Sequence, residues 1–415
     1  MSLLTDIGPL RESTDFRRLW FGQSVSQLGQ QMTAVTVAYQ VYILTRSSFA
    51  VGLVGLYSLL PLIAGGLYGG ALVDAFDRRK VALVTALGLW ICSGLLVLQA
   101  AFELKSVGLL YVVVAVQSAL FAVNNTARQT ILPRLVSKES LPAANALTMA
   151  SFNLGFTVGP LLGGFIIAWY GVETAYAIDA ITFSAAVYAV LRLPPMTPPG
   201  GPGRAPGLKS VTEGLRFLAK APNLRMTFIL DLCAMVFSQP RALFPALAIT
   251  VYAGSASTLG ILQAAPAIGS LLAFLVSGWV IRVHRHGIAI AVAVVIYGAS
   301  VAAAGFSAMG LPGMLWLGVT FLALSGSADM VSAVYRSTML QSATPDELRG
   351  RLQGVFVVVV AGGPRLGDFL AGSLASLTSE ETAMVIGGFA CIVGVGLAMA
   401  RQRNFAMYDS RHPTP

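Results

Sequence analysis

The sequence carries little charge. Asp, Glu, Lys and Arg make up 11% of its 415 residues, whereas a soluble globular protein carries about a quarter of such residues. Apolar residues make up 56% and the mean hydropathy is +0.75, so many apolar side chains must face lipid rather than a protein core. The formal charge of +9 does not indicate nucleic acid, because the basic residues lie in short gaps between apolar runs. We expect a membrane protein.

Cysteine is also scarce. Cys92, Cys233 and Cys391 lie far apart inside apolar segments, without the C-x-x-C spacing or histidine partners of a metal site. We therefore expect neither disulfide nor metal, and interpret the three as small buried side chains.

Two further absences exclude classes of function. No Gly-Lys pair occurs in the chain, so the phosphate-binding G-x-x-x-x-G-K-[ST] loop of ATP-driven pumps is missing and primary transport by this chain alone is excluded. The histidines, His284, His286 and His412, lie outside the apolar runs with no carboxylate or nucleophile arrayed around them. A membrane-embedded enzyme is thus a remote alternative, and no cofactor is expected.

Twelve segments are apolar enough, and nearly long enough, to cross a bilayer. They are Leu19–Leu44, Phe49–Val73, Val81–Phe102, Gly108–Thr126, Asn145–Tyr170, Ala175–Leu193, Leu224–Tyr252, Leu259–Val283, Ile288–Met309, Gly313–Val334, Leu352–Leu377 and Ala383–Ala400. A Pro- and Gly-rich break, Pro194–Gly207, divides them into halves. We predict two six-helix bundles at 1–193 and 223–401, a linker with a short amphipathic helix at 194–222, and a tail at 402–415.

Orientation follows from the positive charges. Of the 27 Lys and Arg residues, 23, including Arg128 and Arg336, fall on one side of the predicted spans, two on the other, and Arg241 and Arg365 within spans. An excess of Lys and Arg marks the cytoplasmic side, so both termini and the linker are predicted to be cytoplasmic. We expect no cleavable leader at the N-terminus. The expected location is the inner membrane of a bacterium.

The halves repeat each other at an offset of 208 residues. Arg128, Thr130 and Leu132 recur as Arg336, Thr338 and Leu340; Gly159 and Gly164 recur as Gly367 and Gly372, and Gly70 as Gly278. A common offset that agrees with the hydropathy indicates duplication. Two parallel six-span repeats are described for a large class of secondary transporter, which binds substrate between its halves.

Three stretches carry a resemblance to a known family. They are GALVDAFDRRK at 70–80, NLGFTVGPLLGG at 153–164, and the loop from Arg128 to Leu147 with its counterpart from Thr344 to Gly354. On these stretches the chain resembles the major facilitator superfamily over nearly its whole length, and within it the branch of enterobactin exporters. The resemblance implies export of a small organic molecule, such as a siderophore or drug, by a monomer in the lipid bilayer.

The first stretch is similar to the family signature G-x-x-x-D-x-x-G-R-[KR]. Gly70, Asp74, Arg78 and Arg79 match, and Asp77 stands where the family has glycine. Gly70 allows close helix approach, while Asp74 can meet Arg78 and a helix N-terminus. We interpret this group as a breakable conformational latch; the alternative is charge that only sets topology.

The second stretch is similar to the antiporter motif G-x-x-x-G-P-x-x-G-G. The matching residues are Gly155, Gly159, Pro160, Gly163 and Gly164. Glycines at this spacing form a flat face for packing, and a membrane helix tolerates the proline. The resemblance points to export, whereas a generic packing helix is the alternative.

Polar residues inside predicted spans are the candidate site. In the resembled fold, helices 1, 4, 7 and 10 line the cavity. We therefore assign substrate contacts to Gln23, Gln27, Gln30, Gln117, Asn124 and Arg241 on these helices, and add Arg365 of the eleventh predicted span because it is ionisable at membrane depth. A proton-coupled exporter needs a buried carboxylate that loads and releases a proton, and the candidates are Asp231, Asp329 and Asp368. Two roles stay open: a carboxylate beside Arg241 as a structural counter-ion, and Arg365 with Asp368 as an inert pair.

Asp179, in the sixth predicted span, is expected to have a structural role in which its carboxylate snorkels to the membrane surface. The direction of transport is also open, because the same fold serves uptake and facilitated diffusion.

Overall fold

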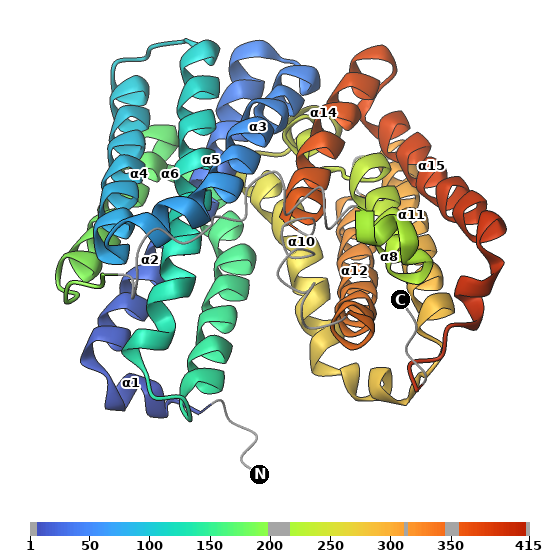
Figure 1. Ribbon diagram of the computed structural model, residues 1–415. Helices are drawn as coiled ribbons and strands as arrows, with labels where there is room; N and C mark the ends of the chain where they lie inside the picture. Colours follow the sequence, from blue (N-terminus) through green and yellow to red (C-terminus); the bar gives the residue numbers. More distant parts are fainter. Residues whose placement is uncertain (1–5, 198–215, 311–313, 345–356, 412–415) are drawn as a thin grey trace. The chain divides into compact units, whose positions relative to one another are not determined.

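The computed structural model describes residues 6–197, 216–310, 314–344 and 357–411, and these residues form helices and no strand. The first part of the chain contains α1 (Gly8–Glu12), α2 (Thr14–Thr45), α3 (Ser48–Ala75), α4 (Arg78–Ala101), α5 (Val107–Leu135) and α6 (Leu141–Leu191) (Figure 1). The second part contains α8 (Pro222–Leu232), η1 (Cys233–Phe237), η2 (Arg241–Leu243), α9 (Phe244–Ala246), η3 (Leu247–Val251), α10 (Ala256–Leu275), η4 (Ser277–Arg282), α11 (His286–Ala308), α12 (Leu315–Ala343), η6 (Val357–Ala361), α14 (Gly362–Leu377), α15 (Glu380–Arg401) and η7 (Arg403–Met407).

Short polar side chains fix where several helices begin. Asp77, Ser106 and Ser379 each accept a hydrogen bond from a backbone N–H in the first turn of α4, α5 and α15. Ser255 forms a reciprocal capping box with Thr258 at the start of α10. These caps satisfy N–H groups that have no partner inside the helix.

Nine helices in the described part of the chain are long and apolar enough to cross a membrane. The 32-residue α2 is not one of them, because its many glutamines and threonines lower its hydropathy. The predicted spans 145–170 and 175–193 lie in one 51-residue element, α6, whose backbone leaves helical geometry at Gly171, with φ 84° and ψ 173°. Twelve spans and cytoplasmic termini stay predictions.

One predicted span ends earlier than expected. We predicted a helix to Val283, but α10 ends at Leu275 and the shorter η4 follows. Ser277 and Gly278 are weaker helix formers than the apolar residues before them, and the Ser277 hydroxyl donates to the carbonyl of Phe274 at 2.7 Å.

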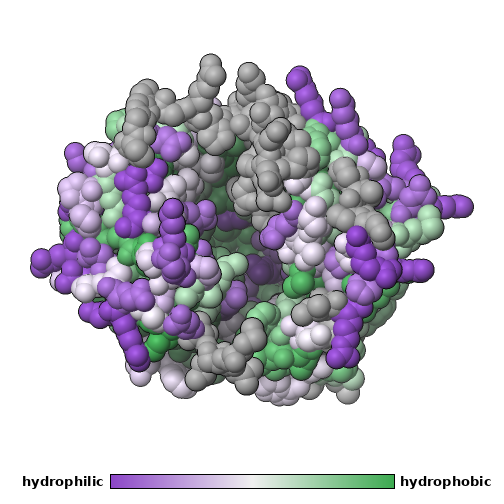
Figure 2. All heavy atoms as spheres, turned by 60° about the horizontal axis from the view of Figure 1, so that its bottom comes forward, coloured by the Kyte–Doolittle hydropathy of each residue, from purple (hydrophilic) through white to green (hydrophobic). Residues whose placement is uncertain are grey.

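Large apolar side chains cover much of the exposed surface. Leu377, for example, is 83% exposed, and Leu60, Trp169 and Leu275 are also exposed. Figure 2 shows hydrophilic side chains mainly at the left and right edges of the face in view. This distribution fits helices whose sides contact lipid and whose ends reach water.

The helices group into two compact units. Unit 1 comprises Met1–Leu44 and Tyr57–Gly207, and unit 2 comprises Thr45–Leu56 and Leu208–Pro415. In unit 1, α4 packs against α5 and α6; in unit 2, α11 packs against α12 and α15, and α10 against α12. The boundaries of the predicted linker stay a prediction, because residues 198–215 lie outside the described ranges.

The first turns of α3 belong to unit 2. The hydroxyl of Ser48 donates to Glu380 at 2.8 Å. A Cβ on Gly52 would lie 2.6 Å from the carbonyl oxygen of Asp368, and one on Gly372 would lie 2.5 Å from that of Ser48. Glycine on both helices therefore allows the start of α3 to pack directly on the backbone of α14.

Candidate functional site

A small polar pocket lies inside unit 1. Its polar wall consists of Gln23, Ser26, Gln27, Gln30, Asn124, Asn125 and Arg128, and Leu89, Phe121, Phe152 and Phe183 complete it. Four of the predicted substrate contacts, Gln23, Gln27, Gln30 and Asn124, thus come together from α2 and α5. Gln117 is half-buried and is not part of this wall.

The hydrogen bonds of Asn124 fix its position. Its side-chain nitrogen donates to the carbonyl of Ala82 at 3.0 Å and to the hydroxyl of Thr85 at 2.7 Å, both on α4. These bonds hold α5 against α4, so Asn124 has a structural role whatever else it contacts.

Arg128 also lines this pocket, although from the sequence alone it is predicted to lie between spans. α5 continues to Leu135, beyond the predicted end at Thr126, and therefore carries Arg128. Its Nε is buried and has no hydrogen-bond partner among the described residues. The shared offset of Arg128 and Arg336 was the signal that could have found it.

An ion cluster forms in unit 2 around Arg336. The guanidinium contacts the carboxylate of Asp231 on α8 directly, and it lies 3.4 Å from a carboxylate oxygen of Asp329 on α12. The side chains of Asp231 and Arg336 are 5% and 15% exposed, so the pair is largely screened from water. Two of the predicted proton carriers therefore share one arginine, which was likewise predicted to lie between spans.

Asp368 lies near the middle of α14, in a different charged group. The charges of Arg241 and Arg365 both act on it, and it accepts a hydrogen bond from the backbone N–H of Ala242. Its other carboxylate oxygen is buried without a hydrogen-bond partner among the residues described. Arg365 donates to the carbonyl of Ala361 at 2.6 Å, while Arg241 is exposed at η2, where the helix is broken.

Asp179 was expected to snorkel, and that expectation is wrong. The residue is 1% exposed, because α6 directs it against α2 and α4. One oxygen accepts a hydrogen bond from the Ser93 hydroxyl at 2.7 Å, and the other has no partner in the described part of the chain. A Cβ on Gly29 would lie 2.6 Å from that second oxygen, so the absence of a side chain there makes room for the carboxylate.

The signature loop forms a tight turn although Asp77 replaces the family glycine. Asp77 has φ −55°, which any residue adopts, and its carboxylate caps α4 at the N–H of Lys80. The second oxygen accepts from the N–H of Met196 at 2.9 Å. Aspartate therefore makes the turn and also holds the chain that follows α6.

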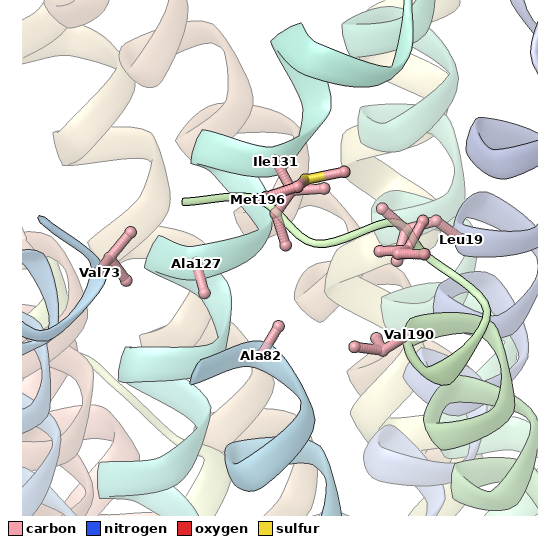
Figure 3. Close-up of a cluster of buried hydrophobic side chains, with 8 residues drawn as sticks. Leu19, Val73, Ala82, Ala127, Ile131, Val190 and Met196 are labelled. Atoms are coloured by element: carbon pink, nitrogen blue, oxygen red, sulfur yellow. The ribbon is translucent and has the colours of Figure 1, made fainter. Parts of the chain in front are cut away.

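The rest of this loop is tied to the same unit. Arg78 donates to the carbonyl of Thr130 at 3.2 Å, and Arg79 to that of Leu191 at 2.6 Å. The charge of Asp74 acts on Arg78. Met196 is buried in a cluster with Leu19, Val73, Ala82, Ala127, Ile131, Val190 and Leu193 (Figure 3). These contacts all lie within unit 1, and the latch stays a prediction.

The glycine motif of α6 packs on α2. A Cβ on Gly155 would lie 2.7 Å from Gln27, one on Gly159 would lie 2.5 Å from the Cβ of Gln31, and one on Gly163 would lie 3.1 Å from the Cα of Met32. The face is thus filled by the helix that carries the pocket glutamines. The motif therefore has the packing function that was given as the alternative, and its link to export rests on the resemblance.

Comparison with known proteins covers nearly the whole chain. A family model described as transmembrane secretion effector matches residues 4–412. The enterobactin exporter EntS of Citrobacter koseri is 30% identical over 401 residues, 96% of this chain and 94% of that protein. EntS of an Escherichia coli strain is 31% identical over 402 residues, with the same coverage of both chains.

Solved transporter structures share the fold. A mutant form of the nucleoside transporter NupG aligns with a TM-score of 0.73 at 15% identity, covering 94% of this chain and 100% of that chain. A bacterial homologue of the iron transporter ferroportin in an inward-facing state aligns with a TM-score of 0.69 at 15% identity, covering 95% and 98%. At this identity the likeness concerns the fold alone.

Proposed function

This chain belongs to the transmembrane secretion effector family of the major facilitator superfamily, and from that membership we propose that it is a secondary active exporter of a small organic molecule. It is a transporter and not an enzyme. The proposed direction of transport, export, is based on the similarity to enterobactin exporters over 96% of the chain. We place it in the inner membrane of a bacterium, as a monomer with two six-helix bundles that alternate in access.

We propose that the transported molecule is a siderophore or a drug-like compound with several polar groups. The pocket of unit 1 presents amides and one guanidinium, which suits oxygen-rich ligands because amides donate and accept while arginine only donates. Arg241 and Arg365 are proposed as further contacts in unit 2. The latch of Gly70, Asp74, Arg78 and Arg79 is proposed to control the exchange between inward- and outward-facing states.

Export is proposed to be coupled to protons. Asp231, Asp329 and Asp368 were predicted as carriers, and burial adds Asp179. Arg336 offsets the charge of Asp231 and Asp329, which suits them better as counter-ions of this arginine. Among the described residues, Asp179 has hydroxyl groups around it, and Asp368, although the charges of Arg241 and Arg365 act on it, keeps one buried oxygen without a hydrogen-bond partner. A proton bound at either site would remove charge from low-dielectric surroundings, which makes these two the stronger candidates.

Counterflow and accumulation in everted membrane vesicles test the proposal. With a panel of siderophores and drugs, we expect accumulation of at least one compound, which stops when the pH gradient is collapsed at constant voltage. Vesicles without the protein are the control. Accumulation that persists without a pH gradient contradicts proton coupling, and transport that only equilibrates the compound supports the alternative of facilitated diffusion.

A further inference from the structure

The ion cluster of unit 2 has a counterpart in unit 1 that lacks both carboxylates. At the repeat offset of 208, Arg336 corresponds to Arg128, Asp231 to Gln23, and Asp329 to Phe121. Unit 1 therefore keeps the arginine but replaces both of its acidic partners by an amide and an aromatic ring.

Contacts inside each unit show that this correspondence is spatial. A Cβ on Gly159 would lie 2.5 Å from the Cβ of Gln31, and one on Gly367 would lie 2.8 Å from the Cβ of Gln239; both residues of the second contact are 208 positions further on. A second crossing agrees: Gly29 meets Asp179 in unit 1, and Phe237 meets Gly387 in unit 2. The two halves thus place equivalent positions of α2 and of the segment from α8 through Gln239 against equivalent partners.

Gln23, Phe121 and Arg128 all line the pocket of unit 1. Arg128 forms no ion pair with any described residue, and its buried Nε has no hydrogen-bond partner there. A buried guanidinium nitrogen without a partner is costly; the Nε of Arg336 is unpartnered in the same way, but its terminal nitrogens have two carboxylates beside them, which Arg128 lacks among the described residues. The pocket volume is about 30 Å³, which suits a small group such as a carboxylate rather than a whole organic molecule.

We propose that the pocket of unit 1 binds an anionic oxygen group of the transported molecule, a carboxylate or a phenolate, on Arg128, in the position that Asp231 occupies on Arg336. A guanidinium binds such a group through two parallel hydrogen bonds. Gln23, Gln27 and Asn125 supply neutral hydrogen bonds around it. The proposal rests on the proposed function in one respect, that the ligand is the transported molecule.

Binding to the purified full-length protein tests this directly. Benzoate is the probe and benzamide its neutral counterpart, and their affinities are measured by calorimetry in a nonionic detergent without phospholipid, so that no lipid phosphate competes. We expect benzoate to bind on the order of tenfold more tightly than benzamide, and Arg128→Gln to remove this preference. Equal affinities of the wild-type protein for the two compounds would overturn the proposal.

A matched pair of substitutions at Gln23 keeps the test decisive if Arg128→Gln fails to fold. Gln23→Asp places a carboxylate where unit 2 has Asp231, so Arg128 should pair with it and benzoate binding should fall. Gln23→Asn shortens the side chain equally without adding charge. We expect the Asn variant to bind benzoate on the order of tenfold more tightly than the Asp variant; equal benzoate affinities of the two variants contradict the proposal.

Adding phospholipid vesicles to the purified protein distinguishes two sources of an anionic oxygen group: the transported molecule and a lipid headgroup. If anionic vesicles abolish benzoate binding to the wild-type protein while neutral ones do not, the pocket binds a lipid headgroup and the proposal is wrong. Because binding is measured without a gradient, it does not depend on proton coupling. If benzoate binds but no gradient-driven export is found, only the proposed function is contradicted. If export occurs and Arg128→Gln leaves it unaffected, only this inference is contradicted.

Discussion

At the scale of single residues, the two arginines at equivalent positions have opposite surroundings. Arg336 is held by Asp231 and Asp329, whereas Arg128 has no carboxylate partner among the described residues. The free energy of unfolding should therefore respond differently to their removal, since breaking a buried ion pair leaves the partner's charge uncompensated.

We predict that Arg336→Gln lowers the free energy of unfolding by about 3–5 kcal/mol, because it leaves Asp231 buried without its cation. Arg128→Gln is the matched variant and should leave stability unchanged or slightly increased. Denaturant unfolding of both proteins in the same detergent measures the difference. Similar losses for the two variants would contradict the contrast between the halves.

The fold itself does not require a carboxylate at position 179. At the equivalent crossing in unit 2 the positions of Asp179 and Ser93 are occupied by Gly387 and Val301, which are buried and apolar. The same helix crossing therefore forms without a carboxylate, which favours a functional role for the one in unit 1.

We predict that Asp179→Asn abolishes efflux driven by a pH gradient but preserves exchange of substrate at equal pH. Asparagine keeps the size of the side chain and an oxygen for the Ser93 hydroxyl, yet it cannot bind a proton. Ser93→Ala, which removes only the hydrogen bond, should keep the coupling. Vesicle efflux with and without a gradient provides the measurement, and wild-type efflux by the Asn variant would exclude Asp179 as a proton carrier.

At the scale of elements, glycine faces determine how closely the helices approach. α2 meets one part of α6 at Gly155, Gly159 and Gly163, and its own Gly22 and Gly29 meet the part beyond the break at Gly171. α2 is therefore enclosed by a single long element, and its polar side chains are held in fixed positions towards the pocket.

We predict that Gly159→Val lowers stability by about 1–3 kcal/mol, because the added side chain meets Gln31 and the backbone of Leu28 in a packed interface. Gly94→Val is the matched control, since a Cβ there has no atom within 4 Å. Thermal unfolding in detergent compares the two. A Gly159 variant as stable as the Gly94 variant would show that the α2–α6 contact can relax.

At the scale of the whole molecule, the charge bias predicts which loops face the cytoplasm. Ser106, before α5, and Ser137, after it, are both exposed, and they lie on opposite sides of one predicted span. The native cysteines are buried, so they should give little background in a labelling experiment.

We predict that an impermeant maleimide labels Ser106→Cys in intact cells, whereas Ser137→Cys is labelled only after the membrane is permeabilised. The asymmetry follows from the excess of Lys and Arg on the cytoplasmic side. Labelling of both positions in intact cells, or of Ser137→Cys alone, would reverse the predicted topology.

The family, the helical fold and the repeat can all be predicted from the sequence. Hydropathy is averaged over about 20 residues, so small errors in the helix ends do not change which segments are predicted to span the membrane. The 208-residue offset relates equivalent positions of the two halves without any structure. The motifs likewise identified Gly159 and Asp77 as special, because glycine and loop charges stand out locally.

The pairing of the charged residues depends on tertiary packing and cannot be predicted from the sequence. Asp231 and Arg336 are 105 positions apart, and their contact depends on how α8 and α12 are rotated, which no local pattern specifies. The same holds for Asp179, whose burial results from contact with α2 and α4 rather than from its depth along α6. The offset indicated that Arg128 and Arg336 correspond; only the packed side chains showed that one has its anion and the other does not.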